Sequence, residues 1–150
     1  MVLDYFLIKG EEKEQIKVSL NEVYGFPDTT SPFGGYDVRW IVEITSGNYY
    51  TTGELWYTTG EISLFYEGLL KAYKNCSGIL QYITYETNLE ISLEFIKLGK
   101  LEVKGRYKER FDKDNELIFC FETNQSYLIE TIEQLQQIHN KYGGMRGINK

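Results

Sequence analysis

The sequence predicts an α+β fold: an antiparallel sheet of about seven strands in meander-like order, with two helices, at about 61–75 and 125–142, packed on one face. Stretches in which apolar and polar residues alternate, as in half-buried strands, clearly outnumber stretches with helical spacing. Aromatic residues make up 15% of the chain, a composition suited to strands. A chain of 150 residues can form one core, so we expect a single domain over 1–150.

The first part of the chain contains four predicted strands and the longest predicted loop. Ile16, Val18 and Leu20 alternate with polar residues, as in a strand with one buried face. Residues 24–35 contain both prolines and three glycines, which predicts a loop. Residues 46–48 form a predicted turn, which makes a hairpin of the strands around it. The four predicted strands are 2–8, 14–23, 36–45 and 49–58.

The pentapeptide Tyr-Thr-Thr-Gly-Glu occurs twice, at 50–54 and 57–61, and its two copies are predicted to differ in structure. After the second copy, apolar residues recur at helical spacing. Thr58 and Glu61 also fit a capping box, so the second copy begins a helix. The first copy is followed by strand-like residues, and Gly53 is a candidate for a β-bulge.

Residues 88–110 contain two alternating runs, which predict a hairpin. Residues opposite each other share a face of the sheet, so the loop length must suit both runs. A two-residue turn would place charged residues on the apolar face. A three-residue loop at 98–100 pairs Phe95 with Val103 and satisfies both faces, so we expect this loop.

The last part of the chain contains two further strands and the second helix. Leu117, Phe119 and Phe121 share one face of the strand 116–122, whereas the inward face of the strand 77–86 is ambiguous. The helix 125–142 has an apolar stripe and ends at a Gly-Gly pair. His139, the only histidine, is predicted to have a structural role in its last turn, and Cys76 and Cys120 are predicted to be buried, reduced thiols.

Charge and motif content argue against several classes of function. The formal net charge of −6 disfavours direct binding to nucleic acid or to an anionic membrane. No apolar run approaches 18 residues and no leader peptide is recognisable, so we expect a cytoplasmic protein. A single histidine cannot supply a histidine-based metal site or triad. We therefore predict no catalytic residues, no metal and no cofactor.

Charge is distributed unevenly along the chain. Residues 21–96 contain 10 acidic and 3 basic residues, whereas residues 97–113 contain 7 basic and 3 acidic residues. The acidic block contains both tryptophans, and Trp56 is expected on the outer face of the sheet near Glu43 and Glu54. This block is either a solvated acidic face or a surface that binds a basic protein, because aromatic anchors and complementary charge favour such contacts.

The order and the amino-acid sequences of several segments resemble those of the WapI-type immunity proteins of bacterial contact-dependent competition systems. The resemblance covers about 115 residues, from 34 to 148, and is carried by GGYDVRWIVEITSGNYYTTGELWYTTGEISLFYEGLLKAY, ETNLEISLEF, LEVKGRY and ETNQSYLIETIEQLQQIHNKYGGMRGI. It implies a cytoplasmic protein that binds and neutralises the C-terminal domain of a contact-dependent or polymorphic toxin, often a nuclease. The toxin-binding residues that we predict are Glu43, Glu54, Trp56, Glu61, Tyr50 and Arg39.

Two alternatives remain open at this point. The aromatic sheet could bind a small ligand or serve as an adaptor module. An enzyme with an unrecognised carboxylate site is less favoured, since pairs such as Glu90 and Glu94 are expected by chance among 22 acidic residues.

Overall fold

Eight strands and two helices form the structure, a computed structural model that describes residues 4–84 and 88–145. The α+β class and both helices are therefore confirmed. In chain order the elements are β1 (Tyr5–Lys9), β2 (Gln15–Tyr24), β3 (Asp37–Ser46), β4 (Tyr49–Thr58), α1 (Thr59–Asn75), β5 (Ile79–Ile83), β6 (Leu89–Phe95), β7 (Lys100–Tyr107), β8 (Leu117–Asn124) and α2 (Gln125–Tyr142).

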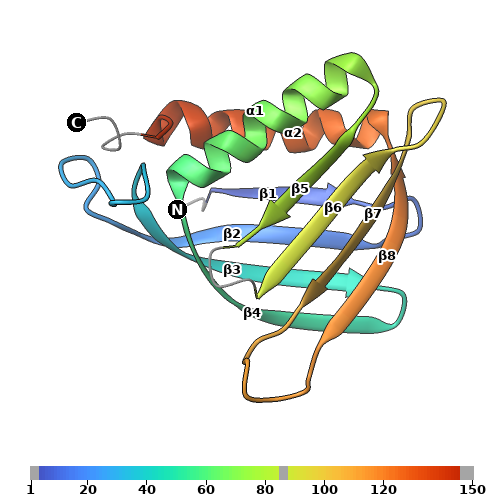
Figure 1. Cartoon of the computed structure of the whole chain (residues 1–150), viewed down its shortest axis with the longest axis horizontal. Helices are drawn as coiled ribbons and strands as arrows, with labels where there is room; N and C mark the ends of the chain where they lie inside the picture. The colour runs from blue at the N-terminus through green and yellow to red at the C-terminus, as the bar shows by residue number, and fades with distance from the viewer. Residues whose placement is uncertain (1–3, 85–87, 146–150) are drawn as a thin grey trace.

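The strands form two antiparallel sheets of four, in the orders β1-β2-β3-β4 and β5-β6-β7-β8, instead of the predicted single sheet of about seven. Within each sheet, neighbours in sequence are neighbours in space, so the meander order holds. The division occurs at α1, because its 17 residues carry the chain from the end of β4 to the start of a separate sheet. Figure 1 shows α1 crossing from one sheet to the other.

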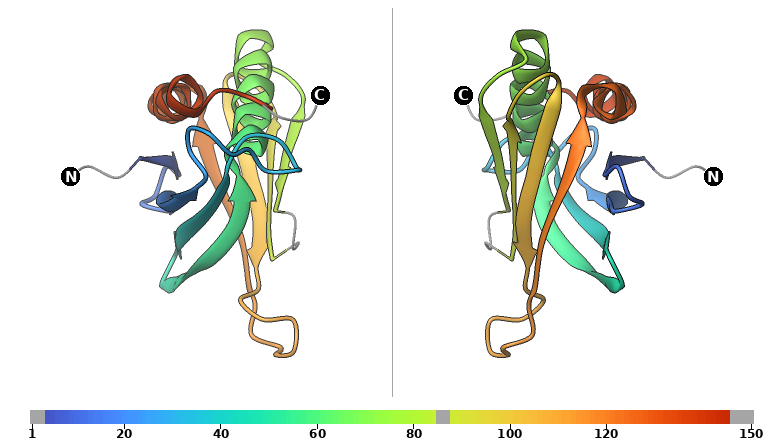
Figure 2. Two further views of the ribbon diagram at one scale, coloured as in Figure 1. Left: turned by 90° about the vertical axis from the view of Figure 1, so that its left-hand side faces the viewer. Right: turned by 90° about the vertical axis from the view of Figure 1, so that its right-hand side faces the viewer.

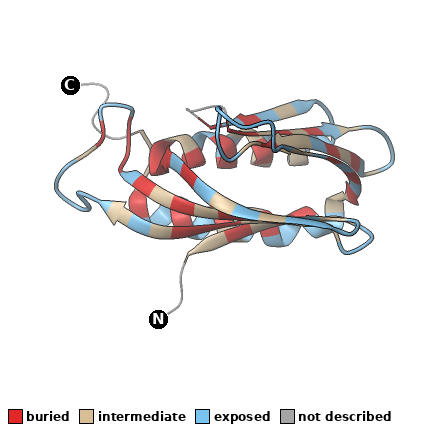
Figure 3. Ribbon diagram, turned by 90° about the horizontal axis from the view of Figure 1, so that it is seen from below, coloured by how far each residue is buried: buried red, intermediate tan, exposed pale blue. Residues whose placement is uncertain are grey.

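The two sheets face each other across one shared core. Buried residues alternate with exposed ones along the strands, as Figure 3 shows, and the buried apolar side chains of both sheets and both helices form a single cluster. The helices lie beside each other along one side of the sheets (Figures 1 and 2). There α1 contacts β4 and β5 while α2 contacts β1 and β8, so the helices close the core between the sheets.

Both helices begin at the side chains that local capping rules favour. The Thr58 hydroxyl accepts a hydrogen bond of 3.2 Å from the Glu61 amide, which is one half of the predicted capping box. Asn124 Oδ1 accepts a hydrogen bond of 3.0 Å from the Ser126 amide at the start of α2. The second copy of the repeated pentapeptide thus begins α1, whereas the first lies in β4.

Gly53 allows close packing between the sheets and does not form the predicted bulge. The β3–β4 register is continuous from one end to the other, so no extra residue is accommodated. A Cβ atom at Gly53 would lie 1.9 Å from the hydroxyl oxygen of Tyr107 on β7. This position therefore requires glycine because an aromatic side chain from the opposite sheet occupies the space.

The β6–β7 hairpin has a three-residue loop as predicted, but residues 97–99 form it instead of 98–100. The Ile96 amide donates to the Lys100 carbonyl at 2.9 Å, and Phe95 lies opposite Leu101 instead of Val103. Because this shift is two residues, every side chain keeps its predicted face.

Both cysteines are exposed, so the prediction of buried thiols was wrong. Cys76 ends α1 in a left-handed conformation, and Cys120 lies on the outward face of β8 because Phe119 and Phe121 occupy the inward face. His139 is in the last turn of α2, as expected, where its Nδ1 lies 2.9 Å from the Ser63 hydroxyl of α1.

Candidate functional site

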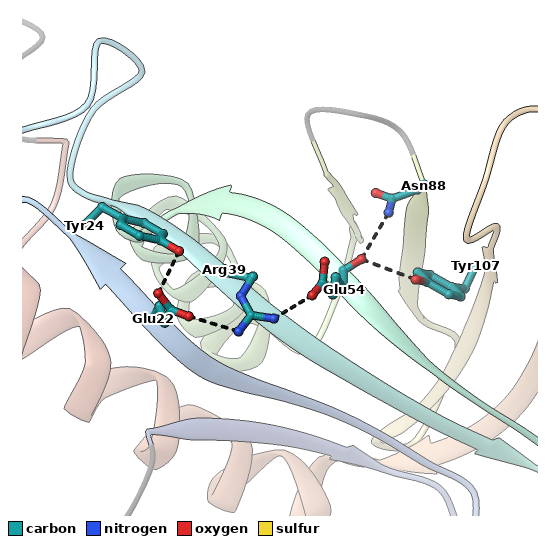
Figure 4. A network of polar contacts seen from close by, with 6 residues as sticks. All are labelled: Glu22, Tyr24, Arg39, Glu54, Asn88 and Tyr107. Carbon is teal, nitrogen blue, oxygen red and sulfur yellow. Dashed lines mark hydrogen bonds and ion pairs between the residues drawn. The ribbon is translucent and has the colours of Figure 1, made fainter.

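The outward face of β2, β3 and β4 carries a group of charged and aromatic side chains that we call the Arg39 cluster: Glu22, Tyr24, Arg39, Glu54 and Trp56. Arg39 lies on the middle strand and bridges two carboxylates, with Nη2 3.0 Å from Glu22 and Nη1 2.5 Å from Glu54 (Figure 4). The alternation of β3 sends Val38 and Trp40 into the core and Arg39 outward.

A β-bulge in β2 brings two members of this cluster to the outer face. The register with β3 shifts between Leu20 and Glu22, so Glu22 lies opposite Arg39. Without the bulge, Glu22 and Tyr24 would share the inward face with Leu20. With it, Val23 packs against the core and the two polar residues face outward.

Two aromatic rings of the Arg39 cluster stack on the protein surface. The centroids of Tyr24 and Trp56 are 6.0 Å apart with an interplanar angle of 21°, and the two residues are 41% and 40% exposed. The Tyr24 hydroxyl donates to Glu22 at 2.9 Å. Stacking and this hydrogen bond hold both rings in one orientation, so a partner would meet a surface that needs little ordering.

The ionisation of the Arg39 cluster follows from its hydrogen bonds. The Tyr24 hydroxyl and the Arg39 guanidinium lower the pKa of Glu22, and the Glu22 carboxylate in turn raises the pKa of Tyr24. Hydrogen bonds to Glu22 and Glu54 raise the pKa of Arg39. Glu22 and Arg39 therefore stay charged at neutral pH, and with Glu54 the formal charges of the cluster sum to −1.

The Arg39 cluster is attached to the second sheet through the backbone of β4. The Glu54 carbonyl accepts hydrogen bonds of 3.3 Å from both Asn88 Nδ2 and the Tyr107 hydroxyl (Figure 4). Burial, followed by the charges of Glu109 and Glu54, raises the pKa of Tyr107 to about 12. The phenol thus remains a donor at physiological pH and ties this part of β4 to β7.

Four of the six predicted toxin-binding residues lie in the Arg39 cluster or near it, on β3 and β4. Arg39, Glu54 and Trp56 are in the Arg39 cluster itself. Glu43 lies further along β3 on the same face, opposite Lys17 of β2 and Thr52 of β4. Among the described residues Glu43 forms no ion pair, and the cation opposite it on β2 is Lys17.

The two other predicted residues lie apart from the Arg39 cluster. Tyr50 is near the far end of β4, six residues or about 20 Å along the strand from Trp56, and lines a separate hollow with Tyr107 and Glu116. Glu61 lies in the first turn of α1, where burial and the nearby charge of Asp37 raise its pKa.

The sequence prediction missed Glu22 and Tyr24. The signal that could have located them is the spacing of apolar residues in β2. Ile16, Val18 and Leu20 follow a period of two, but the next apolar residue is Val23, three positions on. A strand that keeps all four inward must insert an extra residue, and that bulge moves the following polar residues to the outer face.

Among the described residues, no group of three or more His, Cys, Asp or Glu side chains could hold a metal ion. In the same part of the chain, no helix combines the length and apolar character required to cross a membrane. The Arg39 cluster offers exposed rings and charges in fixed positions, which suit contact with another macromolecule.

The structure defines a small α+β protein with stacked rings and bridged charges exposed on one sheet. A family model for the WapI-like immunity proteins matches residues 7–143. The chain belongs to this WapI-like immunity protein family, and its membership supports an immunity role. Comparison with curated proteins and with solved structures gave no significant match.

Proposed function

We propose that this protein acts in the bacterial cytoplasm, where it binds and neutralises the C-terminal toxin domain of a contact-dependent or polymorphic toxin. Its membership of the immunity family supports a cognate toxin as its partner. The observation that carries the choice of surface is the Arg39 cluster, in which stacked rings and bridged charges are exposed on strands that the core holds in place.

The proposed toxin domain is basic, and a nuclease fits this description. Beyond the formal charge of −1 in the Arg39 cluster, the same face carries Asp37 and Glu43, with Lys17 opposite Glu43, and Glu61 of α1 lies near Asp37. A nuclease needs a positively charged surface to bind phosphates. By covering that surface, an acidic protein would exclude the nucleic acid, and complementary charge would speed the encounter.

The basic segment 97–113 is a poorer candidate for the docking surface because acidic residues from elsewhere in the protein compensate much of its charge. Lys100 lies within 4 Å of both Glu11 and Glu122, at 3.8 and 3.9 Å. Arg106 bridges Glu90 and Glu116, in the same way that Arg39 bridges two carboxylates. Compensation lowers the net charge of this segment, and the stacked rings of Tyr24 and Trp56 distinguish the outward face of β2–β4, so we propose that face as the surface for a basic partner.

Co-expression tests this proposal directly. The toxin domain encoded beside this gene is expressed in cells with and without the immunity protein, and the two proteins are then co-purified. We expect survival and a stable complex only when both are present. Equal killing with and without the immunity protein would reject the immunity function for this pair.

Charge reversal tests the proposed surface separately. Glu43→Lys and Glu54→Lys should slow association with the toxin domain and flatten its dependence on salt. Glu133→Lys, on an exposed position of α2, changes net charge equally and serves as the control. Association rates that respond equally to all three substitutions would show that net charge alone, and not this face, guides the encounter.

A further inference from the structure

Most sheet edges in this protein are covered. An edge strand exposes a row of unpaired N–H and C=O groups, which other chains can bind. On the edge strand β1, the Leu7 amide donates to Gln134 Oε1 at 2.8 Å, and the Leu7 carbonyl accepts a hydrogen bond of 2.5 Å from the Thr131 hydroxyl. Two side chains of α2 thus satisfy the outward backbone groups of Leu7.

The edges formed by β8 and β4 also have partners. The Glu122 carbonyl of β8 accepts a hydrogen bond of 2.9 Å from the Glu11 amide in the turn between β1 and β2. On β4, the Glu54 carbonyl accepts the hydrogen bonds from Asn88 and Tyr107 described above. Each contact occupies one outward carbonyl of its strand with a group from the opposite sheet or its turns, so an added strand could not pair along the whole of either edge.

The remaining edge, β5, is open among the described residues. Hydrogen bonds of 3.0 Å from Phe95 to Gly78 and from Thr84 to Leu89 show that even-numbered residues of this segment pair with β6. The N–H and C=O groups of Ile79, Gln81 and Ile83 therefore point away from the sheet, and in the described part of the chain they have no hydrogen-bond partner. Figure 2 shows β5 at the border of its sheet.

A hollow of about 250 Å³ lies between this open edge and the first turns of α1. Its walls include Leu64 and Phe65 of α1 and Tyr82 of β5, and the Glu61 carboxylate lies among them. Tyr82 is only 2% exposed, and its hydroxyl interacts with that of Tyr57 without forming a hydrogen bond of normal geometry among the described residues. A buried hydroxyl without a partner is costly, so a polar group that entered the hollow would gain by binding it.

We propose that β5 is the docking edge for an extended segment of the partner protein, which adds a fifth strand to this sheet and inserts a lysine or arginine side chain into the hollow. This inference rests on the proposed function, because the partner is the toxin domain. The apolar stem of the basic side chain would lie against Leu64 and Phe65. Its charged end would meet Glu61 and donate to the Tyr82 hydroxyl.

The charges around the hollow favour a cationic side chain over a neutral one. Burial and the charge of Asp37 both disfavour the ionised form of Glu61, as the raised pKa of this carboxyl indicates. A cation placed here would remove that penalty. Asp37 also lies opposite Tyr24 and Thr58 at the end of β3, so it connects the hollow to the Arg39 cluster. One partner could therefore contact both surfaces.

Residue-specific hydrogen exchange tests the added strand. Amide exchange is measured by NMR in the free protein and in its complex with an inactivated form of the toxin domain encoded beside the gene. We expect the amides of Ile79, Gln81 and Ile83 to exchange at least tenfold more slowly in the complex. The amides of Leu80 and Tyr82 already pair with β6 and should be protected in both states. A complex in which the three outward amides exchange as fast as in the free protein overturns the proposal.

Substitutions at Gln81 and Glu61 provide a second test. Because the Gln81 amide faces away from the sheet, Gln81→Pro removes an outward donor and leaves the β5–β6 hydrogen bonds in place. It should weaken toxin binding at least tenfold more than Gln81→Ala, which keeps the amide and removes the same side chain from the wall of the hollow. Glu61→Gln should weaken binding about tenfold. Thermal unfolding of each variant checks that the fold is retained.

The outcomes separate this inference from the proposed function. If the toxin domain binds the wild type and Gln81→Pro equally, the docking edge is wrong while the immunity function stands. If the toxin domain does not bind the wild type at all, the proposed function fails and the docking edge fails with it.

Discussion

Removing the Trp56 side chain should weaken toxin binding by a factor that can be estimated from its exposure. Trp56 is 40% exposed, so a partner can cover that part of the side chain. A tryptophan offers up to about 250 Å² of surface, so roughly 100 Å² is available for burial. At about 25 cal/mol per Å², Trp56→Ala would cost about 2.5 kcal/mol of binding free energy, or roughly a 60-fold increase in Kd.

Isothermal titration calorimetry with an inactivated toxin domain measures this change, and Ile129→Ala is the matched control. Ile129 is 47% exposed on α2, an exposure similar to that of Trp56. Its loss should leave Kd within about twofold of the wild type, because α2 contributes to neither proposed docking surface. Trp56→Ala also removes the stacking on Tyr24, so its unfolding free energy is measured separately. A folded Trp56→Ala variant with an unchanged Kd would refute the role of the Arg39 cluster.

Three further substitutions test the packing and the electrostatics. Gly53→Ala should lower the free energy of unfolding by about 2 kcal/mol or more in urea denaturation, because its Cβ would overlap the Tyr107 hydroxyl. Glu61→Gln should stabilise the free protein at pH 7, because burial raises the pKa of Glu61 above its usual 4.5 and ionisation therefore opposes folding. In pH-dependent unfolding this gain should shrink as the pH falls through the raised folded-state value and vanish below 4.5. Tyr82→Phe removes a buried hydroxyl that forms no hydrogen bond of normal geometry, so the free energy of unfolding should stay the same or rise by up to about 1 kcal/mol. The same substitution should weaken toxin binding in calorimetry. A loss of stability in Tyr82→Phe would show that the hydroxyl has a partner.

Local periodicity predicted most of the elements because each one carries its own pattern of burial. The second helix was predicted with the bounds that the structure has, 125–142, since its apolar stripe, its cap and its final glycines agree. Division into two sheets could not be predicted in the same way. Which strands pair depends on contacts between distant residues, and a helix between two strands is compatible with either one sheet or two.

The candidate site was predicted in part because strand alternation specifies which side chains face outward. Once the core positions of β3 and β4 are assigned, Arg39, Glu54 and Trp56 must share the opposite face. Tyr50 shares this face by alternation, but a strand extends about 3.3 Å per residue, so six residues separate it from Trp56 by about 20 Å. The hollow beside β5 had no signal in the sequence, because the inward face of this strand was ambiguous and its walls come from three separate elements.

The Arg39 guanidinium limits which carboxylates of this acidic face a basic partner can pair with. The two carboxylates nearest the stacked rings are already paired with Arg39, so a basic partner must compete with an internal cation for them. Glu43 forms no such ion pair among the described residues, with Lys17 opposite it on β2, and Glu61 lines the hollow beside β5. Long-range attraction would therefore come from the whole face, whereas the strongest new charge pairs would form at its two ends. The rings between these ends would then supply apolar contact at positions that the Arg39 bridge holds in register.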